Sequence, residues 1–224
     1  MKLSKQFKQI LDDEKSTETD AMRFIKSYPM LMVRLFNVSW NYYRVFPEFQ
    51  LGTEYRADFM VLSADSGSWH SVFIELEGPN DQIYLKKGGP AKKLRAAQLQ
   101  ISDWQKYVRA HGDTVKQEIA RRLKKRRVIA QNKLMGKGGW AHDEILLPDV
   151  FVWDSYKIML GQRKSFDDEP ELHMPAPGAG YSPQISTYDR VHDLLVKMEA
   201  DRYINELEEF LTHDDLYSVC DIQH

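Results

Sequence analysis

The sequence predicts an α/β protein of the α+β kind, in which a central mixed β-sheet is flanked by helices. Helical spacing of apolar residues dominates residues 3–36 and 91–127, whereas β-prone segments at 40–49, 55–62 and 69–77 lie between these helical regions. A further β-prone segment follows at 145–160. The chain has 224 residues, the length of one domain or of one domain with an appendage.

The N-terminal part of the chain predicts three helices. Apolar residues at helical spacing indicate the first, over 3–14. The stretch Ser16-Thr-Glu-Thr-Asp20 offers N-cap chemistry for the second, and Pro29 should end that helix or begin the third, over 30–36. The three strands that follow are separated by a turn at Leu51-Gly52 and by a hairpin loop at 63–68, and Gly78-Pro79 ends the last of them.

The second half of the chain alternates helical, strand and loop signals. Pro90 is well placed at the start of a helix that should reach about His111, and a very basic helix is expected over 113–127. Residues 131–140 form a Gly/Lys-rich loop, 145–160 a strand or hairpin, 165–183 a long acidic loop and 187–210 a helix. We therefore divide the chain into an N-terminal helix (1–15), a core (16–164) and an acidic loop with C-terminal helices packing on the core (165–224).

Composition excludes several functional classes. No run of 18 apolar residues is present, and residues 1–8 lack the apolar region of a secretory signal, so we expect no membrane partner. The single cysteine, Cys220, excludes intrachain disulfides and cysteine-based metal sites and is typical of a cytoplasmic protein. No phosphate-binding glycine loop and no Ser-His-Asp or Cys-His arrangement is visible, and we expect no small organic cofactor.

Charge is distributed unevenly along the chain. Residues 86–137 hold 16 Lys/Arg against three acids, whereas residues 165–224 hold 14 acids against three basic residues. Such a basic segment predicts a polyanionic partner, and we expect duplex DNA. A solvated helix or an oligomer contact is the alternative interpretation of the run Arg121-Arg-Leu-Lys-Lys-Arg-Arg127.

Three carboxylates stand where the sequence is otherwise apolar. Glu75 and Glu77 lie in Val72-Phe-Ile-Glu-Leu-Glu-Gly-Pro79, and residues i and i+2 of a strand share a face. Side by side they repel, so a cation should lie nearby or one acid should be protonated. Asp58, in the preceding strand, could join them if the register agrees. Three carboxylates form a hard oxygen site that suits Mg²⁺ or Mn²⁺.

Simpler structural roles are also open for these acids. Asp58 could form an exposed strand pair with Arg56, and Glu75 and Glu77 could lie on the solvent face of an edge strand. The segment 72–79 has few other polar residues, which argues against that interpretation of the two glutamates. Charged side chains rarely occur in so apolar a segment without a partner.

The order and spacing of these motifs resemble a known nuclease family. An Asp on one strand followed by Glu-x-Lys on the next and then a helix is the layout of the PD-(D/E)XK nuclease superfamily. Arg56-Ala-Asp-Phe-Met-Val61, Phe73-Ile-Glu-Leu-Glu-Gly-Pro79 and Ala97-Gln-Leu-Gln-Ile-Ser-Asp-Trp104 together look like the nuclease domain of Shedu (SduA-like) anti-phage defence proteins, over about residues 16–200. The resemblance implies a restriction-endonuclease-like core, a Mg²⁺ or Mn²⁺ cofactor and a homo-oligomer.

The resemblance also implies roles for individual residues. The metal would be bound principally by Asp58 and Glu75, with the backbone carbonyl of Leu76, beside Glu77 as the third carboxylate predicted above, and Gln100 matches the glutamine of the superfamily's helix. The chain departs from the pattern at Glu77, where the motif normally has lysine. We expect Lys93, two helical turns before Gln100, to supply the missing cation. Contacts to the DNA backbone are expected from Lys86, Lys87, Lys92, Arg95, Arg121, Arg122, Lys124, Lys125, Arg126 and Arg127.

The sequence therefore predicts a metal-dependent DNA endonuclease of bacterial anti-phage defence. Loss of the motif lysine leaves open a relative that binds DNA without cutting it. A nuclease acting on RNA is a weaker alternative, because nothing resembles the aromatic motifs of common single-strand RNA-binding modules.

Overall fold

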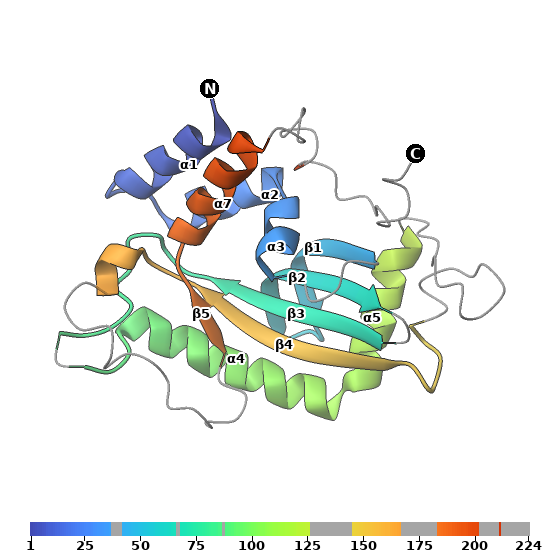
Figure 1. Ribbon diagram of the computed structural model, residues 1–224. Helices are drawn as coiled ribbons and strands as arrows, with labels where there is room; N and C mark the ends of the chain where they lie inside the picture. Colours follow the sequence, from blue (N-terminus) through green and yellow to red (C-terminus); the bar gives the residue numbers. More distant parts are fainter. Residues whose placement is uncertain are drawn as a thin grey trace. The chain divides into compact units, whose positions relative to one another are not determined.

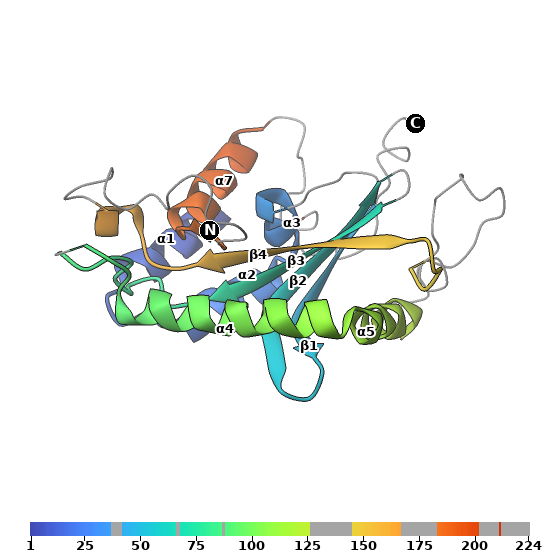
Figure 2. The ribbon, with the colours of Figure 1, turned by 90° about the horizontal axis from the view of Figure 1, so that it is seen from below.

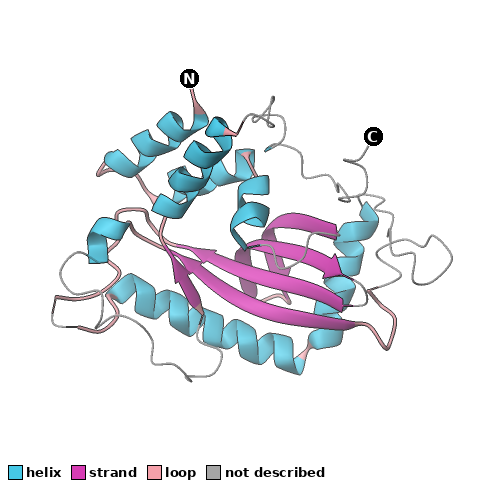
Figure 3. Cartoon of the chain, viewed as in Figure 1, coloured by secondary structure: helices cyan, strands magenta, loops and turns pink. Residues whose placement is uncertain are grey.

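The computed structural model describes residues 1–36, 42–65, 68–86, 88–125, 145–166, 183–201 and 211 (Figures 1 and 3). Its helices are α1 (Leu3–Asp12), α2 (Glu18–Ser27), α3 (Met30–Phe36), α4 (Lys92–Ala110), α5 (Gly112–Lys125) and α7 (Asp189–Ala200), with a short 3₁₀ helix at Arg163–Phe166. The strands are β1 (Tyr42–Leu51), β2 (Tyr55–Asp65), β3 (Ser68–Leu76), β4 (Phe151–Met159) and β5 (Gln184–Ser186). None of the described helices is long and apolar enough to span a membrane.

The strands form one mixed sheet in the order β1-β2-β3-β4-β5. β1 and β2 are antiparallel, whereas β4 and β5 are parallel. The fold class that the sequence predicts is therefore confirmed, a mixed sheet flanked by helices. Because β3 is an internal strand of this order, the interpretation of Glu75 and Glu77 as the solvent face of an edge strand is wrong.

The described residues divide into two compact units. The first contains residues 1–35, 74–101 and those from 156 onward. Its helices pack around Phe7, whose ring centroid lies 4.9 Å from that of Phe24 on α2 and 6.3 Å from that of Tyr188. On α1, Ser4 donates its backbone N–H and its hydroxyl to the Glu199 carboxylate of α7. These contacts fix the two chain-distant helices together within this unit.

The second unit contains residues 36–73 and 102–155. Its hairpin of β1 and β2 pairs from Tyr42↔Ala64 to Leu51↔Tyr55 (Figure 2). α5 buries Val115, Ile119 and Leu123, which recur at the spacing of one helical face. The polar and basic side chains of α5 are left on its other faces, which explains why this helix is so basic and still packs.

The structure differs from the sequence-based expectations at three places. β2 continues to Asp65 and β3 begins at Ser68, so the hairpin loop is shorter than 63–68. Of the strand or hairpin expected over 145–160, the structure has a single strand, which begins only at Phe151 because residues 145–150 form turns and a bend. β5 was not predicted, because three residues with one buried side chain carry no detectable period. The predicted loop at 131–140, most of that at 165–183, the end of the C-terminal helix and Cys220 lie outside the described residues.

Gly161 joins the end of β4 to the loop that follows β3. It has φ +62°, its N–H donates to the carbonyl of Gly78, and a Cβ there would lie 2.6 Å from the carbonyl oxygen of Asp81. We expect Gly161→Ala to lower the free energy of unfolding by about 2–4 kcal/mol, through backbone strain and overpacking. Urea unfolding measures this. Gly89→Ala, at φ +84° with nothing within 4 Å, should cost only about 1 kcal/mol; equal losses would contradict the packing argument.

Candidate functional site

The two glutamates singled out by the sequence lie at the C-terminal end of β3. Glu75 is 8 % exposed and Glu77, directly after the strand, is 7 % exposed. The N–H of Glu77 donates to the carbonyl of Met159 on β4 over 2.9 Å, so strand pairing continues one residue past β3. This backbone contact holds Glu77 at the edge where the chain leaves the sheet.

Lys93 provides the cation that the paired glutamates require. Its Nζ lies 2.8 Å from Oε2 of Glu77, and it comes from the first turn of α4. The hydrogen bond to Glu77 raises the pKa of Lys93 above its ordinary value of 10.5, against the opposing effect of burial. Because the folded-state pKa is raised, the stabilisation from this pair is complete below pH 10.5 and is lost as the pH rises through the raised value. Lys93 therefore stays charged at neutral pH.

Further acids of the same unit act on this pair. Burial raises the pKa of Glu18, at the start of α2, and the charges of Glu77 and Asp81 raise it further, while Lys93 lowers it. Asp81 also accepts a hydrogen bond of 2.8 Å from the N–H of Gly78, and a Cβ at Gly78 would lie 2.6 Å from its carboxylate oxygen. Lys93 is thus the cation of a locally acidic site, and the glycine after Glu77 makes room for Asp81.

Sequence reasoning did not find three other residues of this site, Glu18, Asp81 and Tyr188. Asp81 could have been inferred from the turn Gly78-Pro-Asn-Asp81, because Asp side chains accept from nearby backbone N–H groups in turns. Glu18 and Tyr188 could not, because each is far from Glu77 in sequence and only the folded chain brings them together.

Tyr188 binds the backbone carbonyl of Glu77, whereas Met159 binds its backbone N–H. The buried hydroxyl donates to the carbonyl of Glu77 over 2.8 Å. We expect Tyr188→Phe to lower the free energy of unfolding by about 1–3 kcal/mol, because the buried carbonyl loses its partner. Thermal unfolding measures the loss, and Tyr55→Phe, at a half-exposed ring, should stay within about 0.5 kcal/mol. An unchanged melting temperature for Tyr188→Phe would show that the hydrogen bond contributes nothing.

Asp58 lies on β2, in the second unit. It is 9 % exposed, and Arg56 pairs instead with Glu48, 3.3 Å away, so an exposed strand pair of Asp58 with Arg56 is wrong. Its approach to Glu75 and Glu77 stays a prediction. Gln100 is exposed on α4, and Leu76 is buried. No group of three or more His, Cys, Asp or Glu side chains among the described residues is arranged to hold a metal ion, so the predicted ligation also stays a prediction.

The basic residues expected to contact DNA fall into three groups. Several have exposed side chains: Lys86, Lys92, Arg95, Arg121 and Lys124. The Arg122 guanidinium is turned inward, toward Glu118 and the backbone of β1. The remaining positions, Lys87, Arg126 and Arg127, lie outside the described residues, as does the side chain of Lys125.

Glu118 is the shared partner of two of these arginines. Arg121 donates to both carboxylate oxygens, over 2.6 and 2.7 Å, and Arg122 adds a third hydrogen bond of 2.8 Å. Burial opposes ionisation of Glu118, but these hydrogen bonds outweigh it and lower the pKa of Glu118. The cluster therefore stays ionised at neutral pH.

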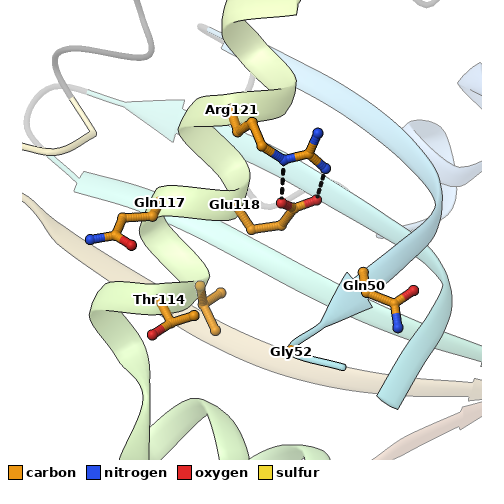
Figure 4. A pocket seen from close by; sticks show the side chains of 7 residues that line it. Gln50, Gly52, Thr114, Gln117, Glu118 and Arg121 are labelled. Carbon is orange, nitrogen blue, oxygen red and sulfur yellow. Dashed lines mark hydrogen bonds and ion pairs between the residues drawn. The ribbon is translucent and has the colours of Figure 1, made fainter. Parts of the chain in front are cut away.

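A pocket of about 320 Å³ adjoins this cluster, between the end of β1 and α5 (Figure 4). It is lined by Gln50, Gly52, Thr114, Val115, Gln117, Glu118 and Arg121. None of the carboxylates that the sequence assigns to catalysis lines it, so the pocket and the candidate catalytic residues are separate features.

A family model described as the C-terminal part of the Shedu protein SduA matches residues 15–137. The chain belongs to this Shedu family. The match includes Asp58, Glu75, Glu77, Lys93 and Gln100 as well as the basic helix α5. The Shedu family is linked to anti-phage defence, which confirms that part of the prediction. No curated protein matches the chain.

Proposed function

We propose that this Shedu family member is a metal-dependent endonuclease that hydrolyses phosphodiester bonds of duplex DNA in anti-phage defence. The observation that carries the proposal is the pair of buried glutamates at the end of β3, with an ammonium group 2.8 Å from the second. Buried acids with a cationic partner at an element terminus are typical of functional sites. The matched family model supports the same class of protein.

The donor chemistry of the site fits a hard divalent cation. Glu75 and Glu77 offer carboxylate oxygens, and Asp58 and the carbonyl of Leu76 would complete the ligands, as Mg²⁺ and Mn²⁺ prefer. A bound divalent ion would neutralise phosphate charge and lower the pKa of a bound water. The ion pair with Lys93 limits what Glu77 can give to a metal, so Asp58 and Glu75 are the principal ligands of the proposal.

The protein's own residues would act on the phosphate in two ways. Lys93, kept protonated by Glu77, would stabilise the negative charge that develops on the phosphate. In this proposal Glu77 does not itself replace the motif lysine but holds Lys93 of α4, whose ammonium group would take that role. Exposed basic residues such as Lys92, Arg95 and Lys124 would bind the DNA backbone without reading its sequence. A homo-oligomer and a cytoplasmic location belong to the same proposal.

A DNA-binding protein that does not cut is the second candidate. It is favoured by the absence, among the described residues, of three side chains arranged around a metal position. Incubating the purified protein with linear and supercoiled DNA, with Mg²⁺, with Mn²⁺ or with chelator, separates the two functions. Metal-dependent strand breaks support the endonuclease. Retarded DNA without breaks under every metal condition would refute it and leave the binding protein.

A further inference from the structure

The backbone of β1 is distorted at Glu48. This residue has φ 50°, and it is the one non-glycine residue with positive φ in the described part of the chain. The left-handed conformation is unfavourable for a residue with a long side chain, and it persists only where surrounding contacts hold it. Such outliers indicate a constraint that the rest of the structure imposes.

The distortion lies directly across the hairpin from Asp58. The pairing of β1 with β2 includes Pro47↔Phe59 and Phe49↔Ala57 but omits the step between them, where Glu48 stands opposite Asp58. One residue of each strand lies in this gap, so the register continues across it, and the left-handed backbone of Glu48 interrupts the regular pairing at this one step. The geometry of β2 at Asp58 therefore depends on how β1 is held at Glu48.

Arg122 of α5 holds the distorted segment. Its Nη1 donates to the carbonyl of Pro47 over 3.3 Å and its Nη2 to the carbonyl of Glu48 over 3.0 Å. Nε donates to Glu118, and the guanidinium carbon lies 4.9 Å from the ring centroid of Phe49. One planar group thus binds two successive carbonyls, a carboxylate and an aromatic ring. A lysine has the same charge but lacks this fork of donors.

We propose that Arg122 is a positioning residue for Asp58: it fixes the break in β1 that sets the backbone of β2 at that acid. The inference rests on the proposed nuclease function, in which Asp58 is a metal ligand. It changes the role of Arg122, which the sequence alone assigns to DNA contact. The contacts of its guanidinium lie within the protein, while neighbouring Arg121 is exposed.

The test combines Arg122→Lys with Glu48→Gly. Arg122→Lys keeps the charge for DNA but removes the fork, so we expect kcat for metal-dependent cleavage and the affinity for Mn²⁺ without DNA to fall about tenfold, the loss typical of a disturbed outer-shell partner. KM for DNA should change less than twofold. Glycine adopts φ 50° without strain. Glu48→Gly in the Arg122→Lys background should therefore restore most of kcat and of the Mn²⁺ affinity.

Two matched variants separate this role from others. Glu48→Gln removes the same charge as Glu48→Gly but keeps the Cβ, so it should not rescue Arg122→Lys. Arg121→Ala should instead raise KM for DNA, as expected of an exposed phosphate contact. Thermal unfolding of every variant shows that the chains are folded.

Each outcome decides the question. If Arg122→Lys raises KM and leaves kcat and Mn²⁺ binding as in the wild type, Arg122 is a DNA contact. The positioning role is then refuted, while the proposed nuclease function stands. If the wild type neither cuts DNA nor binds Mn²⁺, the proposed function fails and the positioning role with it. Non-additive changes in melting temperature among Arg122→Lys, Glu48→Gly and the double variant would then show that the contact between residues 48 and 122 is purely structural.

Discussion

Replacing Glu75 with glutamine should reduce metal-dependent DNA cleavage at least about a hundredfold, because loss of an outer-shell partner alone costs ten- to a hundredfold and Glu75 is proposed to bind the metal itself. The substitution keeps the shape of a side chain that is 8 % exposed. It removes a negative charge that lies two residues from Glu77, so it relieves repulsion and the fold should remain. Cleavage of linear duplex DNA at saturating Mg²⁺ measures the loss, and Mn²⁺ binding without DNA should weaken in parallel.

Glu54→Gln provides the control for this experiment. Glu54 is an exposed carboxylate in the turn between β1 and β2, so its replacement removes the same charge from the surface. We expect its cleavage rate to match that of the wild type. Full activity of Glu75→Gln would remove Glu75 from the metal site, whereas equal losses in both variants would indicate a general effect of net charge on DNA binding.

The parts of the fold that the sequence predicts are those with a strong local signal. The capping box at Thr17 and Asp20 begins α2, and α4 ends at Ala110 and α5 begins at Gly112, as expected within about two residues. β2 and β3 follow from their β-branched and aromatic residues. Elements that depend on distant partners were missed, as with β5, whose three residues form a strand only because β4 lies beside them.

The candidate site divides in the same way. Glu75 and Glu77 stand out because charge is rare in an apolar strand, and both are buried. Helical periodicity places Lys93 on a face of α4, but only the folded chain brings it to Glu77. The inward direction of the Arg122 side chain was missed, although Arg122 lies seven residues after Val115 and three after Ile119, on the helix face that α5 buries.

Lys93→Ala should reduce cleavage about a hundredfold, the usual loss when one preorganised donor is removed from developing charge. The stability should fall by about 1–3 kcal/mol, because buried Glu77 loses its partner, and this is only part of the stability of a typical domain, so the variant should remain folded. The activity loss would therefore not be explained by unfolding. Lys197→Ala, at an exposed lysine of α7, should cleave as the wild type does.

Exchanging Glu77 and Lys93 tests whether cleavage needs only an ammonium group at this pair or needs that group to come from α4. The double variant Glu77→Lys with Lys93→Glu keeps an ion pair between β3 and α4 and places lysine at the position where the PD-(D/E)XK pattern normally has it. We expect it to cleave at least about tenfold faster than Lys93→Ala, because a cation again lies beside the phosphate. An exchange variant that folds but cleaves no faster than Lys93→Ala would show that charge neutralisation at the pair is not enough and that the ammonium group acts only when α4 supplies it.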